Sequence, residues 1–259
     1  MLPALGYAVA CSALLACSGS IGSGDATTRK TSMPTPLPIE TPAAAMAHAA
    51  RLTGLDTLTD EIQAKPCTVG EDQPTPFLAQ TLRGTACWDI EYRKVSLRLA
   101  GALPNFKDAQ QREFVVRMRR DSGQLLSIVS AYRGDDPDFR PTPSAAVAEA
   151  QLRGQDEQYT ALPAQPPKLN FLAALSVVLH KGIGSPFLAK EIQAQYVMHA
   201  RGDEAARAVW VITLNGLPPI PVDGPYGDSI PAWQRNHMRN VVDDATGVNL
   251  FGTNSPQPR

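Results

Sequence analysis

The sequence lacks the motifs of the common catalytic centres. Its 259 residues contain no Gly-x-Ser-x-Gly elbow, no phosphate-binding loop, no Gly-x-Gly-x-x-Gly fingerprint and no His-Glu-x-x-His motif. Positive charge is not in excess, because the formal net charge is −1. A chain without a basic surface is a poor partner for nucleic acid. We therefore predict no cofactor, no metal site and no nucleic-acid partner.

Long apolar runs are also missing. The longest apolar segment runs from Leu2 to Ala16, and a membrane-spanning helix needs about 20 apolar residues. No later apolar run approaches that length. A short apolar segment that ends in small residues is typical of an export signal. We therefore expect residues 1–16 to be a signal peptide and the rest of the chain to lie outside the cytoplasm.

The end of this segment carries a specific resemblance. Leu14-Leu15-Ala16-Cys17 resembles the lipobox of bacterial lipoproteins, in which the cysteine is lipidated and becomes the mature N-terminus. The resemblance implies that Cys17 carries more than one acyl chain, which suffices for stable membrane anchoring. Ser18 after the cysteine implies the outer membrane in a cell with two membranes. The alternatives are an ordinary cleaved signal, or an apolar N-terminal helix of a soluble domain.

Cysteine is scarce, and its distribution predicts one disulfide. Of the four cysteines, Cys11 lies within the apolar segment and Cys17 is the expected lipidation site. In an oxidising compartment the remaining Cys67 and Cys87 are expected to form a disulfide. Closing a loop of about 20 residues contributes about 3 kcal/mol in the chain-entropy model. The alternative is two free buried thiols, and zinc is less favoured because neither cysteine has a Cys-x-x-Cys partner.

Composition divides the rest of the chain into four parts. Residues 17–42 are rich in Gly, Ser, Thr and Pro and predict a flexible tether. Residues 43–140 and 141–254 predict two α+β units, and residues 255–259 a tail. Thr41-Pro42 is a helix start signal, and the spacing predicts a first helix over 43–52. Further helices are expected at 144–152 and 169–180.

Alternating apolar residues predict the strands. The register of the first predicted strand changes around Lys94, which indicates either one strand with a bulge or two strands. The expected strands are 87–99, 113–120, 125–132, 192–200, 208–214, 237–243 and 248–253.

The two predicted hairpins align on Gly123 and Gly247. Val241-Val242-Asp243-Asp244-Ala245-Thr246-Gly247 resembles the core of the PepSY motif. The first hairpin departs from this pattern, because Arg119 stands in place of the Asp and Ser122 in place of the Thr. The resemblance implies an α+β fold of two tandem similar units, each with a helix packed on an antiparallel sheet as in cystatins. Modules of this kind are typically extracytoplasmic and are proposed to restrain peptidases or to serve in assembly.

The long proline-rich loop of the second half is the candidate binding site. A long ordered loop in a compact domain is often functional, and proline lowers the entropy cost of binding. The alternative is that this loop packs across the sheet as a structural cover. The candidate binding residues are Leu217, Pro218, Pro219, Ile220, Tyr226 and Trp233.

The remaining polar motifs favour structural roles. Gly227-Asp228-Ser229 matches the nucleophile triplet of one lipase and esterase family, but it lies late in the chain and no Asp-x-x-His follows. Asp243 and Asp244 are adjacent on a strand, so we expect them to point to opposite faces and one of them to cap the turn. His180, His199 and His237 are well separated, so a metal site would require them to converge.

These observations predict a lipid-anchored extracytoplasmic binding or interaction module without catalytic activity. Its expected partner is a protein, a peptide or an envelope polymer. The alternative is an extracytoplasmic hydrolase that uses Ser229 and a histidine, and a third option is a purely structural domain.

Overall fold

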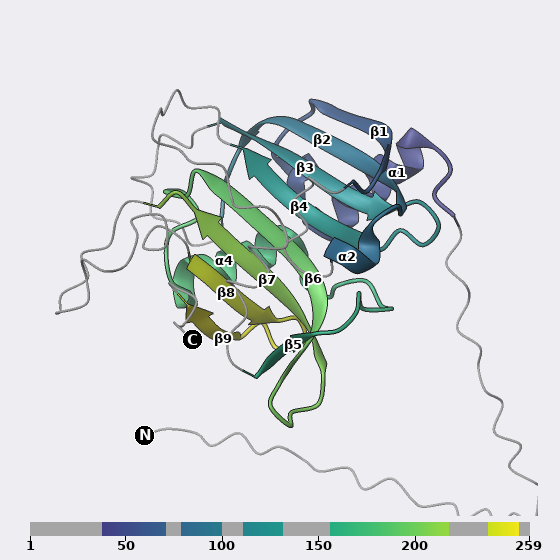
Figure 1. Ribbon diagram of the computed structural model, residues 1–259. Helices are drawn as coiled ribbons and strands as arrows, with labels where there is room; N and C mark the ends of the chain where they lie inside the picture. Colours follow the sequence, from purple (N-terminus) through teal and green to yellow (C-terminus); the bar gives the residue numbers. More distant parts are fainter. Residues whose placement is uncertain (1–37, 71–78, 100–110, 132–155, 218–237, 254–259) are drawn as a thin grey trace, which may run out of the picture. The chain divides into compact units, whose positions relative to one another are not determined.

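The computed structural model describes residues 38–70, 79–99, 111–131, 156–217 and 238–253. In this part the chain forms an α+β fold, an antiparallel sheet of nine strands with the two longer helices, α1 (Pro42–Thr53) and α4 (Phe171–Lys181), packed against one face (Figure 1). None of the helices within these ranges is long and apolar enough to cross a membrane.

The strands follow one another across the sheet in the order β1-β2-β3-β4-β6-β7-β8-β9, and β5 pairs with β6. Every pairing between them is antiparallel. The strands are β1 (Ile62–Thr68), β2 (Ala86–Ser96), β3 (Gln111–Arg119), β4 (Leu125–Ala131), β5 (Glu157–Tyr159), β6 (Glu191–Arg201), β7 (Arg207–Asn215), β8 (Met238–Asp243) and β9 (Asn249–Thr253). The helices are α1 (Pro42–Thr53), α2 (Ala79–Leu82) and α4 (Phe171–Lys181), with a 3₁₀ turn at Leu55–Thr57.

The sheet is continuous across the predicted boundary between the two halves. β4 pairs with β6 from Ile128 opposite Ala194 to Ala131 opposite Glu191. Strands β1–β4 and β6–β9 therefore belong to one sheet. The predicted α+β class with helices on an antiparallel sheet is confirmed at this level.

Aromatic rings connect the helices to the sheet. Phe171 of α4 lies 5.9 Å from Phe114 of β3 and 6.1 Å from Trp210 of β7, measured between ring centroids. Tyr196 of β6 lies 5.4 Å from Trp210. Because aromatic pairs at these separations add to the free energy of burial, this row of rings holds α4 over strands of both predicted halves.

Both main helices begin at side-chain caps. The Thr41 hydroxyl accepts the Ala44 N–H at 3.2 Å, and α1 ends at Gly54, whose φ is +76°. The Asn170 side chain accepts the Ala173 N–H at 2.9 Å at the start of α4. The start and end signals therefore predict α1 closely, whereas α4 begins two residues later than expected because Asn170 forms the cap.

The register change in β2 is a bulge within a single strand. Pairing between β2 and β3 shifts between Tyr92 and Val95, and Lys94 has a φ of +52°. Sequence analysis missed β1, where Pro66 interrupts the alternation, and β5, which lies in a polar stretch. The predicted helix at 144–152 falls outside the described residues.

The predicted disulfide is present. Cys67 of β1 and Cys87 of β2 are bonded and lie directly opposite each other, with their Cα atoms 4.8 Å apart. Cys87 is fully buried in a smaller hydrophobic core on the face of the sheet opposite α1 and α4, together with Val69, Leu82 and Leu126. The disulfide therefore attaches β1, the outermost described strand, to this core.

We expect replacement of both bonded cysteines, Cys67→Ala with Cys87→Ala, to lower the free energy of unfolding by about 3 kcal/mol, because the unfolded chain regains the entropy of a closed loop. Urea denaturation followed by circular dichroism measures the change. The unchanged protein, in which this bond is intact, is the control. Equal urea midpoints for the double variant and the control would contradict the stabilising role.

Candidate functional site

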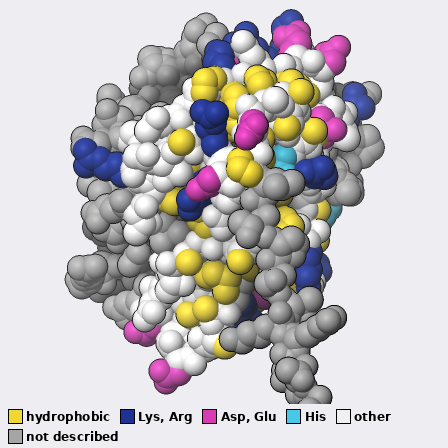
Figure 2. Space-filling model, turned by 90° about the vertical axis from the view of Figure 1, so that its right-hand side faces the viewer, with side chains coloured by type: hydrophobic (Ala, Val, Ile, Leu, Met, Phe, Trp, Pro, Cys, Tyr) yellow, Lys and Arg dark blue, Asp and Glu magenta, His cyan; other side chains and the backbone are white. Residues whose placement is uncertain are grey.

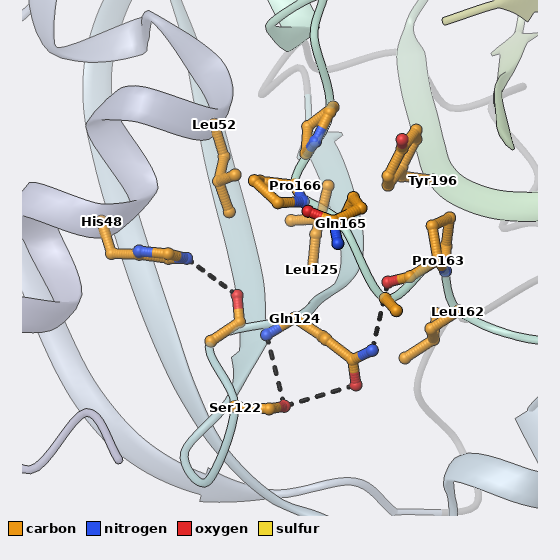
Figure 3. Close-up of a pocket in the computed structure, with 13 residues that line it drawn as sticks. His48, Leu52, Ser122, Gln124, Leu125, Leu162, Pro163, Gln165, Pro166 and Tyr196 are labelled. Atoms are coloured by element: carbon orange, nitrogen blue, oxygen red, sulfur yellow. Dashed lines mark hydrogen bonds between the residues drawn. The ribbon is translucent and has the colours of Figure 1, made fainter. Parts of the chain in front are cut away.

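A cavity of about 170 Å³ opens at the junction of the two predicted halves. Its walls come from α1, the β3–β4 turn, residues 162–167 and β6 (Figure 3). His48, Leu52 and Leu125 belong to the first half, and Pro163 and Tyr196 to the second. The cavity therefore exists only because both halves fold together.

The pairing of β6 explains why space opens here. On one edge of β6, pairing with β4 ends at Ala194 and pairing with β5 begins at His199. Tyr196 lies between these two positions and is directed into the cavity (Figure 3). The segment 162–167, which follows β5 and leads to α4, forms the facing wall. A local break in strand pairing thus creates the site.

His48 is held on both ring nitrogens. The guanidinium of Arg51 can only donate, and its Nη2 lies 2.9 Å from His48 Nδ1, so Nδ1 is the acceptor. The other nitrogen, Nε2, then carries the proton and donates to the Gly123 carbonyl at 3.0 Å. Burial lowers the pKa of His48, and the charge of Arg51 lowers it further against the opposing bond to Gly123. The imidazole is therefore neutral and has no free nitrogen.

Gly123 permits the close approach of α1 to the turn. Its φ is +68°, a conformation that favours glycine. A Cβ at this position would lie 2.9 Å from both His48 Nε2 and Ile39 Cδ1. The glycine expected for turn geometry thus has a second role, because it allows the hydrogen bond that places His48 in the cavity wall.

Gln124 connects the turn to the opposite wall. Its side-chain amide donates to the Pro163 carbonyl at 3.1 Å, and its Oε1 accepts the Ser122 hydroxyl at 3.3 Å (Figure 3). These bonds satisfy the polar groups of the side chain within the protein. The surface that remains for a ligand consists mainly of leucine and proline side chains and the tyrosine ring.

The Asp244 carboxylate holds in place the cavity wall that the second half provides. Its carboxylate, on a residue that is 5 % exposed, accepts the Tyr196 hydroxyl at 3.0 Å and the backbone N–H groups of Lys168 and Leu169, each at 3.0 Å. Burial and the adjacent negative charge raise the pKa of Tyr196. The phenol therefore stays protonated and continues to donate to Asp244.

The two adjacent aspartates have different partners, as expected. The Asp243 carboxylate accepts the Thr246 N–H at 2.8 Å and its hydroxyl at 2.9 Å, which caps the turn before Gly247. Asp244 instead binds the segment that enters α4. The prediction that one of the pair caps the turn is confirmed.

The predicted binding loop is described only at its first residue. Leu217 is 4 % exposed and packs in the core, so its side chain contributes to stability. The five other candidates, Pro218, Pro219, Ile220, Tyr226 and Trp233, lie outside the described residues, as do Cys17, Ser229 and His237. The prolines of 162–167 were a usable sequence signal for the cavity, but we interpreted this stretch only as a connection.

A second group of titratable side chains lies on the opposite face of the sheet. Arg239 and Glu157 form an ion pair at 2.7 Å, with side chains 1 % and 3 % exposed. The Tyr159 hydroxyl accepts from Arg239 at 2.8 Å, and the His199 ring lies 5.1 Å from the Tyr159 ring. Burial lowers the pKa of His199, although Glu157 opposes this. Since removing one partner of a buried ion pair is costly, we interpret this group as structural.

In the described part of the chain, one group has the residue types of a metal site. Atoms of Cys67, Cys87 and Asp89 lie within 4.8 Å of one another. Both sulfurs, however, are in the disulfide, and the Asp89 carboxylate accepts two bonds from Arg117, each at 2.7 Å. The ligand atoms are thus already engaged in protein contacts.

No protein-family model, no curated protein and no solved structure matches this chain. The cavity is therefore interpreted from its own geometry.

The lowered pKa of His48 predicts acid sensitivity. An unfolded histidine titrates near pH 6.5, whereas the folded one stays neutral to lower pH. The unfolded chain therefore binds this proton first as the pH falls. The free energy of unfolding should decrease from about pH 6.5 down to the folded pKa, and His199 contributes with the same sign.

We expect His48→Gln, which removes the titrating group, to flatten this decline between pH 7 and pH 5, as measured by urea denaturation at each pH. His180→Gln, at an exposed position of α4, controls for loss of an imidazole. An unchanged pH slope in His48→Gln would contradict the assignment of the neutral ring.

The contacts of Asp244 predict that replacing Asp244 lowers the free energy of unfolding more than replacing Asp243. Asp244→Ala leaves the Tyr196 hydroxyl and two backbone N–H groups without their acceptor, and we expect a loss of about 2–5 kcal/mol. Asp243→Ala removes a turn cap and should cost about 1 kcal/mol. Urea denaturation of both variants measures the difference, and equal losses would show that Asp244 does not anchor the cavity wall.

Proposed function

We propose that this protein is a lipid-anchored, extracytoplasmic binding module without catalytic activity, built from two tandem PepSY-like units. The observation that carries the proposal is the cavity at the junction of the units. The polar side chains of His48, Gln124 and Tyr196 are bonded within the protein, and most of the remaining surface is apolar. Such a site suits capture of a ligand better than proton transfer to one.

Matching contacts in the two halves support the tandem arrangement. In each half a helix precedes four strands, α1 before β1–β4 and α4 before β6–β9. The Trp88 indole donates to the Ile39 carbonyl at 2.8 Å, and the Trp210 indole donates to the Leu169 carbonyl at 2.9 Å. Each tryptophan thus attaches the segment just before a helix to the second strand of its own half.

The hairpin turns also match. The Gly123 N–H donates to the Arg119 carbonyl at 3.0 Å, and the Gly247 N–H donates to the Asp243 carbonyl at 2.9 Å. The contact between Asp243 and Thr246 gives the PepSY-like pattern a physical role in the second turn. In the first turn an ion pair between Arg119 and Asp121 takes that place, which explains how the departure from the pattern is tolerated.

The state of the polar side chains supports binding over catalysis. A general base needs a free lone pair within reach of a substrate proton. His48 uses both ring nitrogens, and the Tyr196 phenol is committed to Asp244. The hydrolase alternative depends on Ser229 and is tested separately below.

The anchor rests on the resemblance of Leu14-Leu15-Ala16-Cys17 to a lipobox. The tether was predicted over residues 17–42, but Ile39 packs in the core and α1 begins at Pro42, so the proposed flexible part is limited to residues 17–37. A flexible segment of that length has a root-mean-square length of about 23–27 Å. The module would therefore remain near the membrane surface, where it meets partners that are themselves in the envelope.

Cell fractionation with metabolic labelling by an alkyne fatty acid tests the anchor. We expect the unchanged protein to be labelled and to sediment with membranes, and Cys17→Ala to lose both the label and the sedimentation. Cys11→Ala, within the same apolar segment, is the matched control and should behave as the unchanged protein. Membrane association that survives in Cys17→Ala would contradict lipid anchoring.

A fluorophosphonate probe, which labels activated serines, tests the absence of hydrolase activity. We expect no labelling in the purified protein. Labelling that disappears in Ser229→Ala but persists in Ser176→Ala would establish the hydrolase alternative in place of the binding module.

A further inference from the structure

We infer that the cavity receives one apolar side chain, of leucine to phenylalanine size, from an extended peptide that carries a carboxylate next to that side chain. This inference rests on the proposed binding function and names its ligand. It depends on three properties of the cavity, which are its satisfied polar groups, its volume and the charges at its margin.

The walls select a neutral, apolar group. The imidazole of His48, the amide of Gln124 and the phenol of Tyr196 all have partners within the protein. A polar ligand group would lose its hydrogen bonds to water without replacement, which is unfavourable. Because burial keeps His48 neutral, the cavity wall also provides no counter-charge for a carboxylate placed inside.

The volume sets the size of the inserted group. An apolar protein cavity of about 150 Å³ binds benzene, and this cavity is about 170 Å³. One leucine or phenylalanine side chain fits this space. The acyl chain of a membrane lipid is too long for it, and an alanine side chain would leave most of it unfilled.

Charged groups next to the cavity determine which ligand residue can flank the inserted apolar side chain. Arg51 and Lys168 are exposed and directly adjoin cavity-lining residues in the chain. Two acidic groups lie beside the lining residues, and both have partners within the protein. Asp121 is bound by Arg119 at 2.9 Å and 2.5 Å, and Asp244 accepts the Tyr196 hydroxyl and two backbone N–H groups.

The Arg51 guanidinium, whose Nη2 lies 2.9 Å from Nδ1 of the cavity-lining His48, therefore lies at the margin. This positive charge favours an adjacent Asp, Glu or terminal carboxylate in the ligand. Figure 2, viewed from the side where α1 lies, shows hydrophobic patches with both basic and acidic side chains beside them.

The described part of a second copy of this chain fits these requirements poorly. The large hydrophobic side chains exposed in its described part are Leu188 and Val248. Neither has an acidic neighbour in the sequence, and Lys190 lies two residues from Leu188. The described part of a second copy therefore supplies no matching side chain.

Titration of the isotope-labelled protein with acetyl-Ala-Phe-Glu-Ala-amide tests the inference by NMR. We expect saturable shifts of the backbone signals of Gly123, Gln124 and Tyr196 at millimolar peptide. Replacing Phe by Ala in the peptide should abolish the shifts, and replacing Glu by Gln should weaken binding about two- to fivefold at low salt. Shifts of equal size with the Ala peptide, or none with the Phe peptide, would overturn the inference.

Matched variants locate the binding. Ala164 is exposed and lines the cavity, so Ala164→Trp should block it and weaken binding at least tenfold. Ala161→Trp, on the same segment outside the lining, should leave affinity unchanged. Arg51→Gln should reduce the preference for Glu over Gln, whereas Arg98→Gln should not. Equal affinities of Ala164→Trp and Ala161→Trp would overturn the assignment.

Two further measurements test for other occupants of the cavity. Saturable shifts of the same signals by decanoate, but not by the peptide, would assign the cavity to an acyl chain and overturn the inference. Concentration-dependent dimerisation that Ala164→Trp abolishes would assign it to a second copy, with the same consequence. Capture of an envelope protein through another surface, with no peptide binding, would overturn this inference while supporting the proposed function.

Discussion

The pairing of β4 with β6 is the contact on which the architecture depends. Four residue pairs, from Ile128 opposite Ala194 to Ala131 opposite Glu191, join strands β1–β4 to strands β6–β9. The Ser130 hydroxyl adds a bond by accepting the Ile192 N–H at 3.0 Å. Since pairing ends at Ile128, the backbone of β4 separates from β6 beside Tyr196, and the space is lined by a proline-rich segment. The same contact therefore joins the halves and opens the cavity.

Neutral histidines occupy both faces of this sheet. His48 lies on the helix-covered face and His199 on the other, and burial lowers the pKa of each. Their partners differ in kind. His48 is placed by one backbone carbonyl and one guanidinium, whereas His199 lies beside the buried pair of Glu157 and Arg239. Protonation of either imidazole is unfavourable, because burial removes the water that would solvate the charged ring.

Short sequence patterns predicted the structural features that depend mainly on neighbouring residues. Thr41 and Gly54 mark the ends of α1, the change of alternation at Lys94 marks the bulge, and the spacing of Cys67 and Cys87 marks the disulfide. The β1 strand escaped notice because its two exposed residues in succession, Lys65 and Pro66, resemble a loop. The β5 strand is three residues long and exists through its pairing with β6. The prolines of 162–167 were a signal for one wall of the cavity, but the cavity as a whole was not predictable. His48 and Gly123 are 75 residues apart, and their contact depends on tertiary packing.

The composition of β1 has a consequence for molecules held close together. As the first strand in the order, β1 pairs with β2 alone among the described strands. Lys65 there is exposed and charged, and Pro66 has no N–H to donate. Charge and proline on such a strand oppose its pairing with a strand from another molecule. Under the proposed lipid anchoring, copies tethered to one membrane would collide frequently, and an outer strand of this kind would disfavour the growth of intermolecular sheets.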